Sequence, residues 1–333
     1  MEQPRREDYL KKKIVPFKIN NLRNIDDILI ALKDCSFQGR NLGKALDILY
    51  EMVSDNDCFT ILTLSGAMVP AGMGDLICVL MEHRLIDILI STGANITHDF
   101  IDAVLSGGHY LGSPNVNDDN LFEHRINRIY DVFLPEDNYD IAEKELLKIL
   151  NKTFPTKEFE IMPSEFFRII GKELKKRSIL SVAAANEIPI FVPAISDSEF
   201  ALDLIKFTET EEYDIDFRVL RDVKKFARII RDAKECGTLI IGGGVPRNWA
   251  QQIYPYIENV EQLRRKDYEF GYKYSVRIHT ATEYDGGLSG CTISESKSWG
   301  KYSSESKYVS VWCDATIALP ILVTGLLQRL KIL

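Results

Sequence analysis

Six short apolar segments, separated by stretches with helical patterns, constrain the fold of this chain most strongly. Their residues are almost continuously apolar and do not alternate with polar ones, which is typical of strands buried on both faces of a parallel sheet. Helical patterns follow the first two segments, over about 72–83 and from about His98. This alternation predicts an α/β fold with a doubly wound, mostly parallel sheet of the Rossmann type. The six segments are 58–64, 85–92, 188–195, 237–244, 274–282 and 308–315.

Composition excludes several classes of protein. The 333 residues carry a formal net charge of -8 and no basic block, so nucleic acid is not an expected partner. The longest apolar run, ATIALPILVTGLL, is too short and too interrupted by proline to span a membrane. The N-terminus is charged and unlike a signal peptide, and the six cysteines form no C-x-x-C pair. We therefore expect a cytoplasmic protein with reduced thiols.

The chain is long enough for one large α/β domain. We expect an N-terminal arm over residues 1–25 and a single domain over 26–333. Residues 106–187 differ from the rest because they contain polar, turn-rich stretches such as GSPNVNDDN. We interpret them as an insertion on the same sheet and not as a separate domain.

Small residues follow most of the expected strands, at the edge where an open parallel sheet binds its ligands. The stretch LIIGGGVPRN runs from a strand into three glycines, and Pro246 is well placed to begin a helix. Glycines let a ligand approach the backbone, and a helix N-terminus attracts phosphate. The stretch lacks the G-x-G-x-x-G pattern of dinucleotide-binding loops, so nucleotide binding and a plain tight turn both stay open.

Two other patterns are set aside. GRNLGKAL (39–46) is similar to a phosphate-binding loop, but its glycines are one residue too close, and Ala45 stands where a magnesium-binding Ser or Thr belongs. A turn before a helix is expected there instead. The five histidines form no H-E-x-x-H motif and no cluster with cysteine, so no metal site is expected.

The polar stretch SESKSWGKYS (294–303) holds the candidate nucleophile, Lys301. A nucleophilic lysine needs a lowered pKa, and burial beside an indole lowers it by desolvating the ammonium. Trp299 can exclude water, Gly300 permits a tight turn, and Glu295 can bind a cation or carry a proton. The ordinary alternative is a solvated lysine in a surface loop.

Together these stretches resemble the deoxyhypusine synthase family, which includes the homospermidine synthases. The resemblance covers residues 35–327, and SWGK preceded by DGGLSG with DA downstream is its most specific part. It implies a Rossmann-like fold, NAD as cofactor, and a homotetramer with each active site at a dimer interface. The matching motifs are GRNLGKALDIL, STGAN, NRIYDVFLPEDNY, IPIFVPAISD, LIIGGGVP, EYDGGLSG, SWGK and DA.

The resemblance also implies a reaction. NAD takes a hydride from the carbon beside the secondary amine of spermidine, and the resulting imine passes to Lys301 with loss of 1,3-diaminopropane. A second amine then displaces the lysine and the hydride returns. That acceptor is a lysine of the hypusine-containing translation factor in one branch of the family and putrescine, giving homospermidine, in the other.

The resemblance assigns two sets of site residues. The polyamine contacts are Gly286, Glu295, Trp299 and the catalytic Lys301. The NAD contacts are Gly66, Pro70, Thr92, Gly93, Ala94, Asp197, Gly243, Thr280, Ala281, Asp314 and Ala315.

Five positions depart from the deoxyhypusine synthase pattern. The family's acidic pair after the second strand is Thr97 and His98 here, its histidine after the triple glycine is Asn248, and an aspartate of its DGSDSG motif is Leu288. A further family aspartate is matched only by Asp203, one residue out of register. Because these changes remove groups that would hold polyamine nitrogens, we expect them to alter the choice of donor or acceptor.

Three functions are compatible with these residues. The first is an active aminobutyl transferase, whose acceptor is a protein lysine or, in better agreement with the departures, a free diamine. The second is a catalytically silent NAD-binding homologue that scaffolds or activates a partner subunit. Retention of Lys301, Glu295 and Trp299 argues against it. The third is a plain nicotinamide dehydrogenase, which would not need the lysine.

Overall fold

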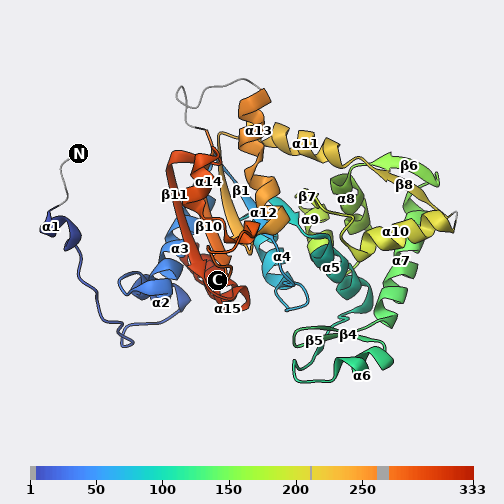
Figure 1. The fold of residues 1–333 in the computed structure, drawn as a ribbon, viewed down its shortest axis with the longest axis horizontal. Coiled ribbons are helices and arrows are strands. Elements are labelled where there is room, and N and C mark those ends of the chain that lie inside the picture. Colours follow the sequence, from blue (N-terminus) through green and yellow to red (C-terminus); the bar gives the residue numbers. More distant parts are fainter. Residues whose placement is uncertain (1–4, 211, 261–269) are drawn as a thin grey trace.

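The computed structural model describes residues 5–210, 212–260 and 270–333. At its centre is a six-stranded sheet in the order β11-β10-β9-β1-β2-β7, in which every neighbouring pair is parallel (Figure 1). All six segments expected from the sequence are strands of this sheet. Their bounds are β1 (Cys58–Leu64), β2 (Ile88–Ser91), β7 (Ile190–Phe191), β9 (Glu235–Ile241), β10 (Tyr272–His279) and β11 (Tyr302–Trp312).

The strand order reverses direction between β1 and β9. From β1 the sheet extends through β2 and β7 on one side, whereas β9, β10 and β11 extend it on the other. Leu62 pairs with Leu89 of β2 and with Leu239 of β9, which places the first strand in the middle of the sheet. The doubly wound Rossmann-like fold is therefore confirmed, and its switch point lies between β1 and β9.

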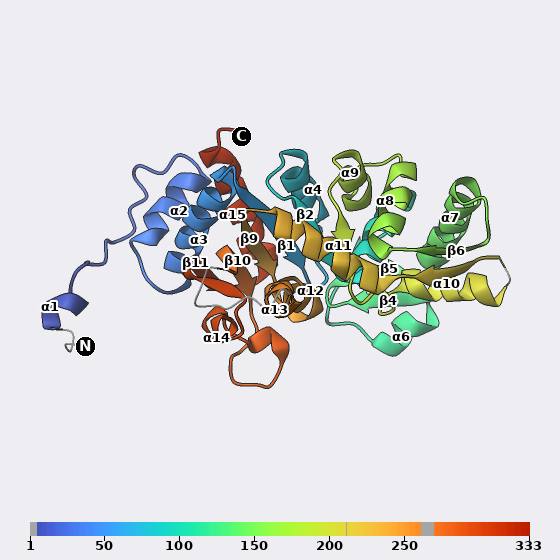
Figure 2. The same ribbon diagram turned by 90° about the horizontal axis from the view of Figure 1, so that it is seen from above.

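Helices cover both faces of the sheet, as Figure 2 shows. Consecutive residues of β1 separate two cores: Leu62 packs in the larger one and Ile61 in the smaller one. This alternation explains why the strands are apolar on both sides. The larger core includes α2 (Ile25–Lys33), α3 (Phe37–Ser54), α4 (Gly74–Glu82) and α15 (Ala315–Arg329). The smaller core includes α11 (Val219–Asp232), α12 (Gly244–Gln251) and α13 (Ile253–Val260).

The stretch GRNLGKAL lies inside α3, so the expectation of a turn before a helix is wrong. Gly43 explains the pattern, because a Cβ at this position would stand 2.5 Å from the Leu29 carbonyl oxygen of α2. The glycine therefore serves close packing between two helices. The helix expected from His98 begins earlier, since α5 runs from Gly93 to Leu105.

Residues 106–187 do not join the central sheet, which corrects the interpretation of an insertion on the same sheet. Within the described ranges their strands form an antiparallel sheet, β3-β5-β4, and one half of a parallel pair, β6-β8. Asp99 of α5 ties this segment to the domain by accepting hydrogen bonds from the backbone N–H groups of Ile179 (2.7 Å) and Leu180 (2.9 Å).

The elements of this region and those that follow it in the chain complete the fold. They are β3 (Tyr110–Leu111), α6 (Asp118–Glu123), β4 (Ile126–Ile129), β5 (Val132–Pro135), α7 (Asp137–Thr153), β6 (Glu158–Ile161), α8 (Pro163–Glu173), α9 (Ile179–Ala185), α10 (Glu199–Glu209), β8 (Asp214–Phe217), the 3-10 turn η2 (Leu288–Gly290) and α14 (Ile293–Ser298).

The first described residues, 5–24, extend away from the domain as an exposed segment with one short helix, α1 (Arg6–Tyr9) (Figure 1). No helix in the described part of the chain has the length and apolar character needed to cross a membrane.

Candidate functional site

A cavity of about 410 Å³ lies at the switch point, where the carboxyl ends of β1 and β9 meet. We call it the glycine cleft. Its walls are mostly small residues that follow the strands. They are Ser65, Gly66, Met68, Ser91, Thr92, Gly93, Ala194, Asp197, Ile241, Gly242, Gly243, Gly244, Val245, Pro246, Ile278, His279, Thr280, Ala281, Ser289, Cys313, Asp314 and Ala315.

The backbone of the glycine cleft has a shape that only glycine readily adopts. Gly66, Gly242 and Gly244 have φ angles of 80°, 77° and 60°, in the left-handed region. Gly243 is extended, but a Cβ there would stand 3.0 Å from Ser289 Oγ and 3.1 Å from an Arg277 nitrogen. A ligand can therefore contact the main chain directly along the turn after β9.

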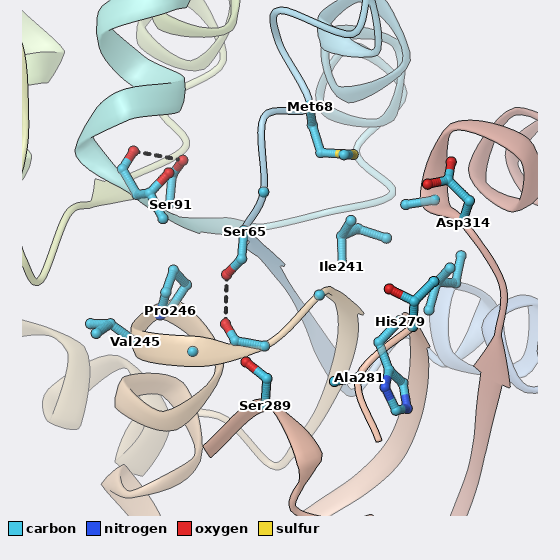
Figure 3. Close-up of a pocket in the computed structure, with 18 of the residues that line it drawn as sticks. Ser65, Met68, Ser91, Ile241, Val245, Pro246, His279, Ala281, Ser289 and Asp314 are labelled. Atoms are coloured by element: carbon cyan, nitrogen blue, oxygen red, sulfur yellow. Dashed lines mark hydrogen bonds between the residues drawn. The ribbon is translucent and has the colours of Figure 1, made fainter. Parts of the chain in front are cut away.

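Three helices begin at the glycine cleft, and one of them lacks a side-chain cap. Thr92 caps α5 and Asp314 caps α15, whereas Gly243 at the start of α12 offers no side chain to the first turn. The free N–H groups of α12 are thus available to an anionic ligand. Ser65 Oγ stabilises the turn by donating a hydrogen bond to the Gly243 carbonyl oxygen (2.5 Å). Ser65 and Ser289 lie on opposite sides of this turn (Figure 3).

A second cavity, of about 620 Å³, surrounds the amine of Lys301. We call it the lysine pocket. Side chains from α12, α13, α14 and the loop after β10 make its walls. They are Asn248, Gln252, Pro255, Glu283, Asp285, Gly286, Gly287, Leu288, Cys291, Glu295, Trp299 and Lys301.

Lys301 is buried, with 8% of its surface exposed, and its Nζ donates a hydrogen bond to Asn248 Oδ1 (3.2 Å). Burial lowers the pKa of this amine, the charge of Arg247 lowers it further, and Cys291 and Glu295 act in the opposite direction. A lysine with a lowered pKa supplies more free amine at neutral pH, which is what a nucleophile needs.

The SWGK stretch forms the turn that the sequence predicts, but the indole does not enclose the amine. Gly300 has a φ angle of 71°, and the Trp299 ring lies 5.9 Å from Lys301 Nζ. Trp299 is 61% exposed in the single chain. Lys301, the residue directly before β11, is therefore buried although its neighbour Trp299 is exposed.

Two buried arginines lie between the cavities. Arg277 donates hydrogen bonds to the carbonyl oxygens of Gly242 (3.0 Å), Cys291 (2.9 Å) and Ser289. It thereby fastens the turn of the glycine cleft to the loop that lines the lysine pocket. Burial, followed by repulsion from Arg247, lowers the pKa of Arg277 to about 9.

The two cavities share a wall. The first residues of α12, Gly244 to Pro246, line the glycine cleft, and Asn248 of the same helix lines the lysine pocket. In η2, Ser289 faces the glycine cleft and the preceding Leu288 lines the lysine pocket. The two cavities thus lie on either side of the same two short segments.

The structure gathers most of the residues expected from the sequence. All of the expected cofactor residues except Pro70 and Ala94 line the glycine cleft. Six expected polyamine residues line the lysine pocket: Asn248, Gly286, Leu288, Glu295, Trp299 and Lys301.

His98 and Asp203 lie outside both cavities of this chain. His98 Nδ1 is 2.9 Å from Nε2 of His109, whose Nδ1 is 2.8 Å from Asp102 Oδ1, and burial lowers the pKa of His98 to about 4. Asp203 lies on α10, where burial, Glu143 and Glu199 raise its pKa to about 7. Their assignment to the polyamine site stays a prediction.

Several site residues were missed by sequence reasoning. Asn95 is buried, accepts a hydrogen bond from the Val69 N–H (3.1 Å) and donates to the Gly66 carbonyl oxygen (2.7 Å), which holds the loop after β1. Its place in the first turn of α5 was the available signal. Arg247, Arg277 and Cys291 had none, because their role depends on contacts between distant segments. Among the described residues, no group of His, Cys, Asp and Glu is suited to hold a metal ion.

The fold and the two cavities define the class: a Rossmann-like α/β protein with a cleft of small residues beside a buried-lysine pocket. The family model for deoxyhypusine synthase matches residues 27–326. Probable deoxyhypusine synthase 2 of Archaeoglobus fulgidus is 41% identical over 295 residues, covering 87% of this chain and 94% of that protein. A deoxyhypusine synthase-like protein of Chlorobaculum tepidum is 33% identical over 320 residues, covering 94% and 89%.

This chain belongs to the deoxyhypusine synthase family. A crystal structure assigned to deoxyhypusine synthase, from Entamoeba histolytica, has the same fold, with a TM-score of 0.63 at 18% identity over 94% of this chain and 96% of that one.

Proposed function

We propose that the protein is an NAD-dependent transferase that moves a 4-aminobutyl group from spermidine, through an imine on Lys301, to an acceptor amine. The observation that carries the proposal is the wall shared by the glycine cleft and the lysine pocket at α12 and η2. Such a wall would set a redox cofactor beside an amine substrate and beside the neutral lysine that has to capture the product of oxidation.

The residues of the glycine cleft fit NAD. The uncapped N-terminus of α12 would take a phosphate, and the Asp314 and Asp197 carboxylates can accept hydrogen bonds from ribose hydroxyls. The left-handed glycines let the main chain approach the cofactor. When bound there, NAD supplies the acceptor for a hydride from the carbon beside the secondary amine of spermidine and returns it at the end of the cycle.

Lys301 performs the covalent step. Its neutral amine adds to the carbon of the oxidised substrate imine, the bond from that carbon to the nitrogen of the diaminopropane part breaks, and protonated 1,3-diaminopropane leaves. A new C=N bond to Lys301 Nζ remains. Attack by a second amine reverses this addition and frees the lysine. Asn248 Oδ1, 3.2 Å from Nζ, orients the amine without adding a charge.

The lysine pocket supplies carboxylates for the remaining amine groups. Glu283, Asp285 and Glu295 line it and can pair with ammonium groups of the polyamine. The exposed Leu288 and Trp299 form its rim. We propose that a second copy of the chain covers this rim in a homotetramer, which size-exclusion chromatography with light scattering would detect.

The acceptor is a lysine of a hypusine-type translation factor or a free diamine such as putrescine. The uncharged Leu288 and Asn248 replace an aspartate and a histidine of the deoxyhypusine synthase pattern, so the pocket holds one anionic group fewer for substrate amines.

Trapping the imine tests the proposal. Purified protein is incubated with NAD and spermidine, reduced with borohydride and digested, and the peptide containing Lys301 is expected to gain one aminobutyl group. Parallel reactions with putrescine and with a candidate acceptor protein identify the acceptor by mass spectrometry. Product formation without an adduct at Lys301 would refute the mechanism.

A further inference from the structure

Arg247 is buried beside the lysine pocket, and within residues 5–210, 212–260 and 270–333 it has no acidic partner. Its side chain is 2% exposed, and its Nε has no hydrogen-bond partner among the described residues. Its other contacts are uncharged: Ser296 Oγ at 3.3 Å and the Leu288 carbonyl oxygen at 3.5 Å. A buried guanidinium without a carboxylate is costly, so stability alone does not account for it.

Two short connections join Arg247 to Lys301. Asn248, the next residue of α12, accepts the hydrogen bond from Lys301 Nζ. Ser296 contacts Arg247 through its hydroxyl, while its carbonyl oxygen accepts a hydrogen bond from the Lys301 backbone N–H (3.3 Å). The guanidinium is therefore fixed relative to the amine by both walls of the pocket.

We propose that Arg247 is a positioning residue: a fixed positive charge that holds Lys301 in its neutral, nucleophilic form. This inference rests on the proposed function for its catalytic meaning, although the charge effect itself can be measured without turnover. A guanidinium keeps its proton at neutral pH, whereas a lysine ammonium beside it loses one more easily.

The other charged and titratable groups around Lys301 act in both directions: Cys291 and Glu295 favour the ammonium and oppose Arg247, so the test measures the contribution of Arg247 by itself. Glu295 is exposed on α14, so solvent screens it, whereas Arg247 acts from a buried position with a lower effective dielectric constant. The neighbouring Arg277 is also buried without an acid and does not neutralise Arg247. The remaining groups that line the pocket are Cys291 after η2 and the exposed Glu283 and Asp285 in the loop after β10.

The pH dependence of amine labelling tests the proposal. Trace acylation with acetic anhydride, followed by peptide mass spectrometry, gives the labelling midpoint of Lys301 in the parent and in Arg247→Met, Arg247→Gln and Arg247→Lys. Lys297 of α14, on the same peptide region, corrects for reagent decay. Either neutral variant is expected to raise the Lys301 midpoint by about one pH unit, the size expected for a unit charge several ångströms away, while Arg247→Lys keeps the parental midpoint.

The controls separate this inference from the proposed function. Labelling needs neither NAD nor spermidine, so a protein without transferase activity can still show the shift. An unchanged midpoint in a folded neutral variant would overturn the proposal, and so would equal shifts in all three variants, which would point to shape and not to charge. If both neutral variants fail to fold while Arg247→Lys folds, the charge serves stability and the proposal is also overturned.

Discussion

The glycine cleft and the lysine pocket are formed by different parts of the structure. The glycine cleft consists of strand ends, helix N-termini and small residues, so its shape follows from the backbone of the fold. The lysine pocket consists of side chains from α12, α13, α14 and the loop after β10. The shape of the glycine cleft therefore changes little unless the fold changes. Single substitutions, in contrast, can change which ligand the lysine pocket binds. Both the departures from the family pattern at Asn248 and Leu288 lie in the pocket.

Removing the nucleophile is the strongest way to distinguish the roles of the two cavities. Lys301→Arg is expected to lower transfer by at least about a thousandfold, because a guanidinium stays protonated and cannot attack. NAD binding to the glycine cleft should be unchanged, as measured by calorimetry. Lys297→Arg, a matched change on α14 at a residue outside the lysine pocket, is the control and should keep parental activity. Retained transfer in Lys301→Arg would show that another group carries the aminobutyl chain.

Filling the turn after β9 is expected to damage the glycine cleft instead. Gly243→Val adds branched carbons at a position where the Cβ alone would stand 3.0 Å from Ser289 Oγ. Overpacking costs about 1–3 kcal/mol, and where the NAD-bound conformation bears this cost the affinity for NAD should fall by about 5- to 160-fold. Calorimetric titration measures this, and Gly243→Ala should have a smaller effect. An unchanged dissociation constant in the valine variant would mean that the cofactor does not approach this turn.

The charge state of Lys301 gives a pH-dependent test of the lysine pocket. Because burial lowers the pKa of Lys301, the amine is neutral over a wider pH range than a solvated lysine, and activity should extend to lower pH. Asn248→Asp puts a carboxylate at the atom 3.2 Å from Nζ, which raises the pKa and protonates the amine. Transfer at pH 7 should fall about tenfold and recover at higher pH. A pH-independent loss would indicate a change of shape.

The smallest expected effect concerns substrate choice at the pocket rim. Leu288→Asp should shift kcat/KM toward spermidine over putrescine, since it adds a partner for one more ammonium group. Leu288 is 44% exposed, so the gain is that of a surface ion pair, about 0.2–1 kcal/mol or a shift of about 1.4- to fivefold. Leu220→Asp on α11 controls for the added negative charge. An unchanged ratio would place the polyamine around Glu283, Asp285 and Glu295 instead.

The same contrast explains how much the sequence could predict. The central strands and the loops after them were predictable because burial on both faces leaves an apolar pattern, and strand ends in this fold meet at one edge. Lys301 was recognisable from its local motif. The linkage of Arg277 to Gly242 and Cys291 was not, because it joins segments far apart in the chain. Gly43 was misinterpreted since a glycine that lets two helices approach looks like a turn residue in the sequence.

The most direct test of the account is whether the two cavities act in one redox-neutral cycle. The substrate is spermidine with two deuterium atoms on the butyl carbon beside the secondary amine, supplied with protein, NAD and acceptor. Mass spectrometry gives the mass of the product, and absorbance follows free NADH. The account predicts that the product keeps both deuterium atoms and that free NADH does not accumulate. Loss of one deuterium from the product, with stoichiometric release of reduced cofactor carrying that deuterium, would contradict it and assign the chain to the simple dehydrogenases.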